Sequence, residues 1–362
     1  MSAAVAGLVP LPYGREDLPG LLGPNWEEWL RTAYRWMLLG RVLDTRMLGM
    51  QRQGRVGFYG PATGHEAANV GLALSLRKED WVFPGLREQL VALARGHPLG
   101  QYVHHLFTDG VDPCKGRQMP CHPTAREVHY VSMSSTVGSQ IIHAVGCAYA
   151  MRLRKDPGAA VACFGDGATS TNEFHAGMNF AGVYQLPVLF FCANNQWAIS
   201  LPVSKQTRVP VLADKAGEYG FNGVRIDGTD VIAVFHTVRA ARERLAEQGP
   251  TLVEPLVYRM TPHTSSDDPT RYVPKGWMEE AAAHDPLTRL EELLDRTGVL
   301  AVTARETLRQ ELETELRKLI AEAEVTPPPG PDTLFVDTFR DTFWPLTEDR
   351  DSFDREQGGH FP

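Results

Sequence analysis

The chain has 362 residues, which suits one large α/β domain with extensions or two smaller domains. Hydrophobic residues make up 43% and charged residues 22%, so a disordered or fibrous protein is excluded. The net charge of −8 comes from 36 basic and 44 acidic residues without a basic cluster, which excludes a general nucleic-acid binder. No apolar run reaches the roughly 18 residues of a membrane span, so we expect no membrane partner.

The first 24 residues are rich in Pro, Gly and Leu and predict an extended arm. No basic segment precedes their apolar stretch, so a signal peptide is not expected. The five cysteines form an odd set without a regular framework, which indicates reduced thiols in a cytoplasmic protein. Cys114 and Cys121, with His122 directly after, could suggest zinc ligands, but no CxxC pair is present and we favour free thiols.

The N-terminal half is predicted to be helical before a long loop. Apolar residues at helical spacing predict a helix capped by Asn25 and ending near Gln53. Further helices are expected over residues 65–76 and 86–94. Residues 109–138 are rich in Gly, Pro, His and Ser and lack periodicity. A loop of this length in a compact domain is typically functional, so we predict an ordered functional loop.

The central segment alternates strands and helices. Strands are predicted over residues 159–164, 187–193, 223–226 and 252–258, and helices over 170–183 and 230–248. This order predicts an α/β fold with a doubly wound, mostly parallel sheet that has helices on both faces.

Two more helical stretches, at 286–296 and 303–324, lead into a C-terminal helical extension. We therefore divide the chain into an extended N-terminal arm (1–24), an α/β domain with helical additions (25–325) and a C-terminal extension (326–362).

Three polar segments follow strands of the predicted sheet: GDG at 165–167, NNQ at 194–196 and TPHTSSDD at 261–268. Parallel strands of such sheets bind ligands at their carboxyl ends, so we expect the three segments to gather at one edge. GDG does not fit the dinucleotide fingerprint, because Ser170 occupies the position of the third glycine. It does not fit a phosphate loop either, because Gly-Lys-Ser/Thr is absent.

Asp166 and Asn195 predict a magnesium–diphosphate site. Asp166 opens a helix, where backbone N–H groups can bind an anion, but its carboxylate would repel a phosphate unless a cation lay between them. Mg²⁺ is a hard cation that is commonly shared between protein oxygens and a diphosphate. Asn195 follows the next strand, 29 positions later, and offers a neutral oxygen. A capping Asp and a turn Asn are the alternative.

The GDG…NN pair is the motif of thiamine diphosphate enzymes, and the chain resembles one family of them. It is similar to the α subunit of the thiamine-dependent decarboxylating component of 2-oxoacid dehydrogenase complexes, most of all to branched-chain members. The matching segments are VFPGLRE (82–88), KGRQMP (115–120), SSTVGSQIIHAVG (134–146), FGDGATS (164–170), HAGMNFA (175–181), NNQWAIS (194–200) and HTSSDD (263–268). The resemblance covers about residues 26–339 and implies the thiamine diphosphate-binding fold.

The resemblance also implies the roles of individual residues. Magnesium would be bound by Asp166, Asn195 and the backbone carbonyl of Trp197. His263 would lie near the reactive carbon of the cofactor and assist acyl transfer. The implied cofactor contacts are Arg87, Ser135, Val137, Gly165, Asp166, Gly167, Ala168, Asn195 and His263. Leu86 and Ala193 depart from the family, which has a tyrosine at the first position and, in some members, an arginine at the second.

A second cation site is suggested by the segment before SQIIHAVG. Ser134, Thr136, Ser139 and Gln140 align with a potassium site of branched-chain members. A helix N-terminal cap formed by Ser or Thr is the alternative, and the sequence leaves both open.

The resemblance implies that the chain does not act alone. In the family a β subunit supplies the glutamate that activates the cofactor, so we expect an α2β2 heterotetramer. The implied reaction is oxidative decarboxylation of a 2-oxoacid, with transfer of the acyl group to lipoyl-lysine of an acyltransferase component. We favour branched-chain 2-oxoacids, while pyruvate and acetoin dehydrogenase α subunits and a non-catalytic paralogue are the alternatives.

Overall fold

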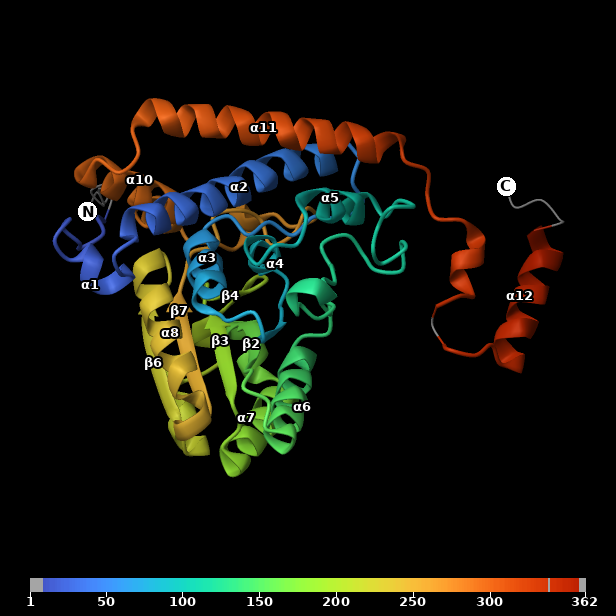
Figure 1. Cartoon of the computed structure of the whole chain (residues 1–362), viewed down its shortest axis with the longest axis horizontal. Coiled ribbons are helices and arrows are strands. Elements are labelled where there is room, and N and C mark those ends of the chain that lie inside the picture. Colours follow the sequence, from blue (N-terminus) through green and yellow to red (C-terminus); the bar gives the residue numbers. More distant parts are fainter. Residues whose placement is uncertain (1–8, 338, 358–362) are drawn as a thin grey trace.

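The computed structural model describes residues 9–337 and 339–357. Its centre is a five-stranded parallel sheet with the order β1-β2-β3-β7-β6. Figure 1 shows β6, β7, β3 and β2 side by side in this sheet. The strands are β1 Trp81–Phe83, β2 Ala160–Gly165, β3 Val188–Ala193, β6 Asn222–Asp227 and β7 Thr251–Leu256. The predicted parallel α/β sheet is confirmed.

Helices cover both faces of the sheet, which is why β3 is apolar throughout and fully buried. Side chains of β2 alternate between the faces, with Val161 and Cys163 in one apolar cluster and Ala162 and Phe164 in the other. On one face lie α3 Glu66–Ser75, α4 Gln89–Ala94 and α8 Val231–Gln248. On the other lie α6 Ser139–Arg154, α7 Asn172–Tyr184 and the 3₁₀ helix Leu212–Tyr219.

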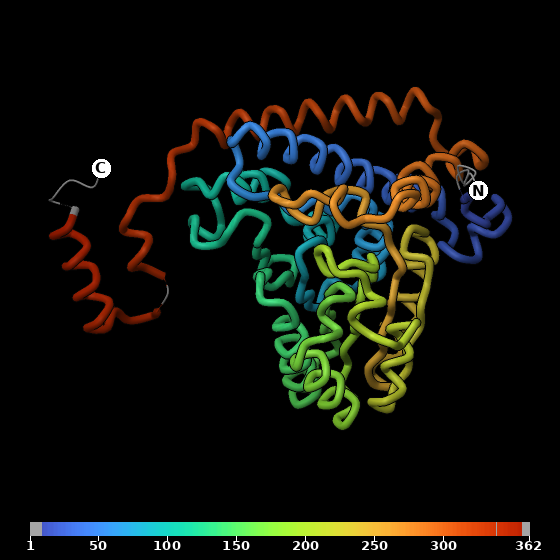
Figure 2. Tube along the Cα trace, turned by 180° about the vertical axis from the view of Figure 1, so that it is seen from behind, coloured from blue at the N-terminus to red at the C-terminus, as the bar shows by residue number. Residues whose placement is uncertain are grey.

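A further helical layer lies above the sheet, where α11 runs along α2 in two opposite views (Figures 1 and 2). It shares its own apolar cluster and comprises α2 Trp26–Arg52, α5 Leu99–Phe107, α10 Pro286–Thr297 and α11 Val302–Val325. Helix α2 begins directly after Asn25, as predicted, although the side chain of Asn25 makes no capping hydrogen bond.

Several local features differ from the predictions. The N-terminal arm is not wholly extended, because it forms the helix α1 Leu18–Leu22. Leu11, Leu18 and Leu22 are buried in the cluster of α2, so burial of leucines holds this segment on the domain. The helix expected from residue 86 starts at Gln89, and α5 and α6 were not predicted.

The C-terminal segment lies apart from the domain in both views (Figures 1 and 2). It is attached to the 109–138 loop, where the amide of Gly110 donates to the carbonyl of Pro327 at 2.8 Å and Arg117 donates to the carbonyl of Val336 at 2.7 Å. It ends in α12 Trp344–Gln357, and Trp344 is exposed.

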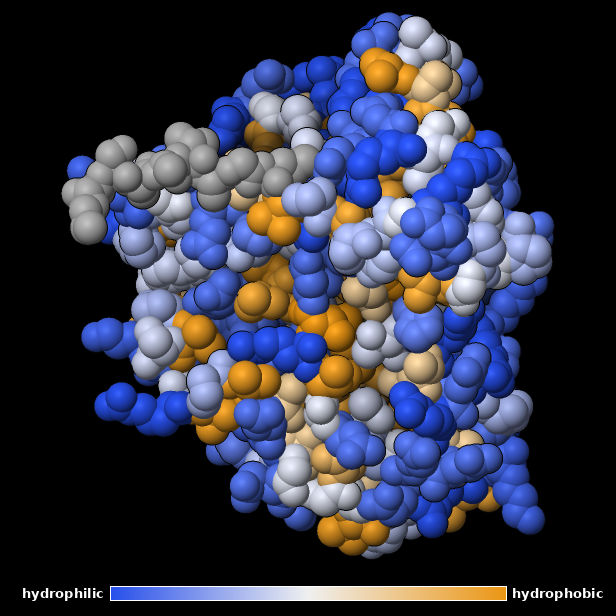
Figure 3. Space-filling model, turned by 90° about the vertical axis from the view of Figure 1, so that its left-hand side faces the viewer, coloured by the Kyte–Doolittle hydropathy of each residue, from blue (hydrophilic) through white to orange (hydrophobic). Residues whose placement is uncertain are grey.

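The side of the molecule that carries α1 and α8 is largely hydrophilic, with small apolar patches between charged side chains (Figure 3). Across residues 9–337 and 339–357, none of the helices is both long enough and apolar enough to cross a membrane. All five cysteines are free, which confirms the predicted thiols.

Candidate functional site

The three polar segments meet at the carboxyl edge of the sheet, as predicted. Gly165 at the end of β2 lies in register with Ala193 at the end of β3, so Asp166 and Asn194 begin side by side. Asn194 pairs with the end of β7 through a hydrogen bond from its amide to the carbonyl of Pro255 at 2.9 Å. The chain then continues from β7 into the 261–268 loop.

The predicted magnesium ligands lie in one closely packed unit. The carboxylate of Asp166 is 1% exposed and accepts a hydrogen bond from Nε2 of Gln206 at 2.9 Å. Burial raises the pKa of Asp166, because the charged form loses its hydration. Oδ1 of Asn195 accepts from the amide of Trp197 at 3.1 Å, which holds the Trp197 backbone beside the amide side chain.

A glycine allows these groups to approach each other. Trp197 belongs to the short strand β4 Trp197–Ala198, which pairs with β5 Leu201–Pro202. A Cβ atom at Gly167 would lie 2.9 Å from Cβ of Ala198, so a larger residue would push β4 away from the GDG turn. A carboxylate, an amide oxygen and a backbone carbonyl form a donor set that suits a hard cation such as Mg²⁺.

Two buried arginines face this unit. Arg87 donates through Nη1 to the carbonyl of Pro61 and through Nη2 to the carbonyl of His263 at 2.9 Å. Arg259 donates to the carbonyl of Ile199 at 2.9 Å and to the hydroxyl of Tyr272 at 2.7 Å. Its Nη1 is buried and has no hydrogen-bond partner among the described residues.

The charges of these arginines are not neutralised locally. Within the described part of the chain, neither Arg87 nor Arg259 has a carboxylate within 4.0 Å. Burial and the charge of Arg259 lower the pKa of Arg87 to about 10. Two buried guanidinium groups beside a donor set for Mg²⁺ fit a diphosphate, which would supply the missing negative charge.

His263 contacts Arg87 directly. Nη2 of Arg87 lies 3.1 Å from Nδ1 of His263, and since an arginine can only donate, the imidazole proton is on Nε2. Burial, followed by the charges of Arg87 and Arg259, lowers the pKa of His263 to about 3. The backbone of His263 donates to Asp267 at 2.7 Å, and Tyr272 donates to the same carboxylate oxygen at 2.5 Å, so the loop is ordered.

The segment before α6 lies at the surface. Ser135 is exposed, and its hydroxyl is 2.5 Å from Nε2 of His122. Val137 is 58% exposed, so its predicted cofactor contact would need an occupant or another chain to cover it. The roles of Ser135 and Val137 stay predictions.

The structure contradicts one interpretation of the predicted potassium ligands. The N-cap residue of α6 is Gly138 and no side chain caps the helix, so the Ser or Thr cap was wrong. The hydroxyl of Ser139 donates to the carbonyl of Thr136 at 2.9 Å, and that of Ser134 accepts from the amide of Thr136 at 3.2 Å. Gln140 is buried, and its Oε1 has no hydrogen-bond partner in the part of the chain that the structure describes, so this oxygen could bind a cation and the potassium site stays a prediction.

The 109–138 loop is ordered by a different group of residues. Nδ1 of His105 and the amides of Cys114 and Gly116 all contact the carboxylate of Asp112, at 2.9 to 3.0 Å. Nε2 of His105 accepts from the amide of His122 at 3.1 Å. Both imidazole nitrogens are therefore used in holding the loop.

Sequence reasoning missed several residues of the site. His65 is buried, with Nε2 3.5 Å from Nδ2 of Asn195, and burial lowers its pKa well below the usual value. Arg259 and Gln206 were missed too, although Arg259 stands just before the polar 261–268 segment at the end of a strand.

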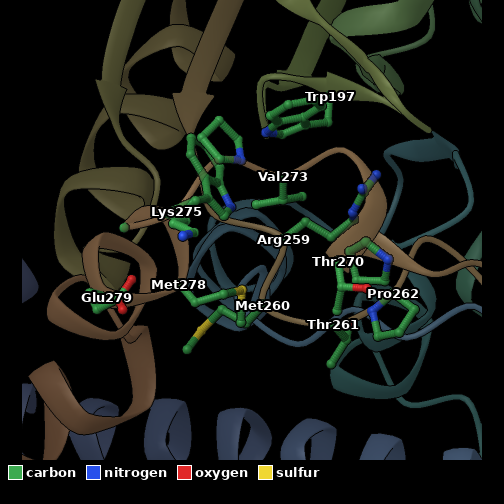
Figure 4. A pocket seen from close by; sticks show the side chains of 14 residues that line it. Trp197, Arg259, Met260, Thr261, Pro262, Thr270, Val273, Lys275, Met278 and Glu279 are labelled. Atoms are coloured by element: carbon green, nitrogen blue, oxygen red, sulfur yellow. The ribbon is translucent and has the colours of Figure 1, made fainter.

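A cavity of about 460 Å³ lies beside the metal donors. The segment 259–279 forms most of its wall, and the side chains of Trp197, Val273 and Met260 line it from several sides (Figure 4). Trp197 packs against Tyr272 and Trp277, with ring centroids 5.6 and 5.9 Å apart. The loop 261–268 therefore borders this cavity through Thr261 and Pro262.

Comparisons with known proteins found a matching family model and several similar chains. A family model described as the dehydrogenase E1 component matches residues 34–332. The chain is 40% identical to the 2-oxoisovalerate dehydrogenase subunit alpha of Bacillus subtilis over 303 residues, which cover 83% of this chain and 92% of that protein. It is 40% identical to the 3-methyl-2-oxobutanoate dehydrogenase subunit alpha of Mycobacterium tuberculosis, covering 82% and 80%. It is 37% identical to the pyruvate dehydrogenase E1 component subunit alpha of Bacillus cereus, covering 83% and 79%.

Proposed function

The chain belongs to the family of dehydrogenase E1 components, and we propose that it is the α subunit of a branched-chain 2-oxoacid dehydrogenase. Its reaction is the oxidative decarboxylation of a branched-chain 2-oxoacid and the transfer of the acyl group to lipoyl-lysine of an acyltransferase component. The observation that carries the proposal is the meeting of Asp166, Asn195 and His263 with the unneutralised cations Arg87 and Arg259.

Thiamine diphosphate, when bound, supplies a nucleophilic carbon and an electron sink for the decarboxylation. Asp166, the amide oxygen of Asn195 and the carbonyl of Trp197 would hold Mg²⁺. Arg87 and Arg259 would bind the diphosphate through their guanidinium groups, together with the amides of Gly167 and Ala168 on the 3₁₀ helix Asp166–Ser170.

His263 moves a proton in this proposal. The pKa of its imidazole is about 3 because burial and two arginines disfavour the charged form. The negative charges of a diphosphate would raise that pKa again, so the ring could take up and release a proton during acyl transfer.

Exposed apolar groups on the face of the sheet that α6 and α7 cover support an assembly with a β subunit. Val137 is exposed before α6, and Phe180, Val183 and Tyr184 are exposed on α7. Phe180 and Tyr184 pack on each other and on Tyr149, and such apolar clusters at a surface often mark an interface with a partner chain. We propose that the complete site forms at an α–β interface of an α2β2 heterotetramer in the cytoplasm, with K⁺ bound near Ser134–Gln140.

The test is decarboxylation by the co-purified α and β chains with thiamine diphosphate and Mg²⁺, comparing 3-methyl-2-oxobutanoate with pyruvate. Preference for the branched acid is the expected result. Preference for pyruvate would favour the second candidate, which the similarity to the Bacillus cereus protein supports. Turnover of neither acid by an intact tetramer would refute the proposal. The α chain alone should be inactive, because the activating glutamate comes from the β subunit.

A further inference from the structure

A buried carboxylate outside the cofactor site uses both of its oxygens on one short segment. Asp44, on α2, accepts from the hydroxyl of Tyr59 through Oδ1 at 2.7 Å. Its Oδ2 accepts from the amide of Ala62 at 2.8 Å and the hydroxyl of Thr63 at 2.7 Å. Three donors to one ionised acceptor make a strong, directional contact. In the described ranges, no lysine or arginine pairs with Asp44, so the segment 59–64 is its only polar partner.

The segment 59–64 in turn contacts both parts of the cofactor site. The carbonyl of Pro61 accepts from Nη1 of Arg87. The carbonyl of Thr63 accepts from the amide of Met260 at 3.2 Å, and that of Tyr59 accepts from the amide of Ser265 at 3.2 Å. These two bonds bracket His263 on either side along the chain. The segment therefore links Arg87 to the loop that carries His263.

The segment has no regular structure of its own, so its shape depends on such contacts. Gly64 closes it with φ +95°, and a Cβ there would lie 1.9 Å from the carbonyl oxygen of Tyr258. Glu66 accepts from the amide of Gly64 at 2.7 Å and holds the same end. Cys121 and Gln89 contact the backbone of Gly60, while Asp44 holds residues on both sides of Pro61 and so sets the position of the Pro61 carbonyl.

We propose that Asp44 is a positioning residue for cofactor binding, which acts through the segment 59–64 on Arg87 and His263. This inference rests on the proposed function. If Asp44 had a purely structural role, removing its hydrogen bonds would lower only the stability of the fold. If Asp44 is a positioning residue, removing these hydrogen bonds also lowers the affinity for thiamine diphosphate, because a displaced Pro61 carbonyl no longer holds Arg87 in place.

The experiment measures the Kd of thiamine diphosphate with Mg²⁺ on the αβ heterotetramer by calorimetry, together with kcat at saturating cofactor and the melting temperature. The variants Tyr59→Phe and Thr63→Val each remove one donor to Asp44 and keep the side-chain volume. We expect each to raise Kd by about tenfold, the lower end of what loss of supporting contacts costs a ligand site. The kcat at saturating cofactor should stay within about threefold.

The matched control is Tyr34→Phe. Tyr34 is also buried, and its hydroxyl donates to Glu291 at 2.8 Å, far from the segment. It should lower the melting temperature as Tyr59→Phe does, but leave Kd within about twofold. Combining Tyr59→Phe with Arg87→Lys should weaken binding little beyond Arg87→Lys alone, since the two act in series.

The outcomes separate the two claims. If the unaltered tetramer fails to bind thiamine diphosphate, the proposed function falls, and this inference falls with it. If the unaltered tetramer binds but Tyr59→Phe and Thr63→Val bind equally well, Asp44 is structural only and the inference is overturned. Fully additive losses in the double variant would also overturn it, because the segment would then act independently of Arg87.

Discussion

Replacing Asp166 with asparagine separates two effects of the buried carboxylate: its effect on the stability of the fold and its contribution to cofactor binding. The carboxylate is 1% exposed, and its one side-chain hydrogen bond comes from Gln206. Asparagine keeps an oxygen for that bond and removes a charge whose burial is unfavourable, as the raised pKa indicates. Without cofactor, Asp166→Asn should therefore leave the free energy of unfolding within about 1 kcal/mol of the unaltered protein, or raise it.

The effect with cofactor should be the opposite. A ligand at 100 times its Kd stabilises the folded state by about 2.7 kcal/mol. For the 362 residues of the α chain alone, the entropy of unfolding is about 0.8 kcal/mol/K, which gives a rise in melting temperature of about 3–4 °C. The rise is smaller if the β chain unfolds together with the α chain, because the entropy of unfolding is then larger. Asp166→Asn should lose this rise, because the metal loses its charged ligand.

The assay is thermal unfolding of the heterotetramer in EDTA and again with Mg²⁺ and thiamine diphosphate. Asp80→Asn is the control, since Asp80 is also buried but pairs with Arg242 at 2.6 Å at the other end of the sheet. Breaking that pair should cost about 3–5 kcal/mol and leave the cofactor-dependent rise intact. A full rise in Asp166→Asn, or a loss of stability like that of Asp80→Asn without cofactor, would refute the reasoning.

Three further predictions concern the arginine and the histidine of the site. Arg87→Lys should weaken cofactor binding by roughly 10- to 150-fold, because a lysine cannot contact Pro61, His263 and a phosphate together. This factor corresponds to the loss of one charge-assisted hydrogen bond of about 1.5–3 kcal/mol. Calorimetry on the tetramer checks this prediction, and an unchanged Kd would contradict it. His263→Asn should bind the cofactor with a Kd within a few-fold of the unaltered protein, and its rate of acyl transfer to lipoamide should fall by roughly 10²–10⁴-fold. Its rate of decarboxylation, measured with an artificial electron acceptor, should fall less. Equal losses in both assays would argue against the proposed role. Without cofactor, the pKa of His263 is about 3 when folded and about 6.5 when unfolded, so the unfolded chain binds the proton first and stability falls as pH drops from 6.5 towards 3. Urea unfolding at pH 5.5 and 7.5 should therefore show a shallower pH dependence in His263→Asn, and an identical slope would disprove the linkage.

The sheet and its ligand edge could be predicted because their signals are local. The apolar runs at 159–164 and 187–193 end directly at GDG and NN, and parallel strands bring their carboxyl ends together. Strand β1 was missed because three residues are too few to show a period. Helix α6 was missed although Ile141, Ala144 and Ala148 have helical spacing, because the polar loop before it hid its start.

The surroundings of the cofactor site could not be predicted in the same way, because they depend on contacts between distant parts of the chain. Asp44 and Thr63 are both unremarkable in the sequence, and only folding places the carboxylate of one beside the hydroxyl of the other. Arg259 likewise becomes a candidate site residue only in the folded structure, where it contacts Ile199 and Tyr272 and its Nη1 has no partner among the described residues.

The structure shows what surrounds Leu86 and Ala193, the two residues that depart from the family. Ala193 ends β3 fully buried beside Gly165, so no side chain from that position reaches a phosphate. Leu86 packs against Gly60, where a Cβ would lie 3.1 Å from its side chain, so an apolar contact to the segment 59–64 stands where the family has a tyrosine hydroxyl. We therefore expect Arg87 and Arg259 to supply the side-chain positive charge for a diphosphate, beside the proposed Mg²⁺. Because each arginine is held by backbone carbonyls and not by carboxylates, both charges remain available to the ligand.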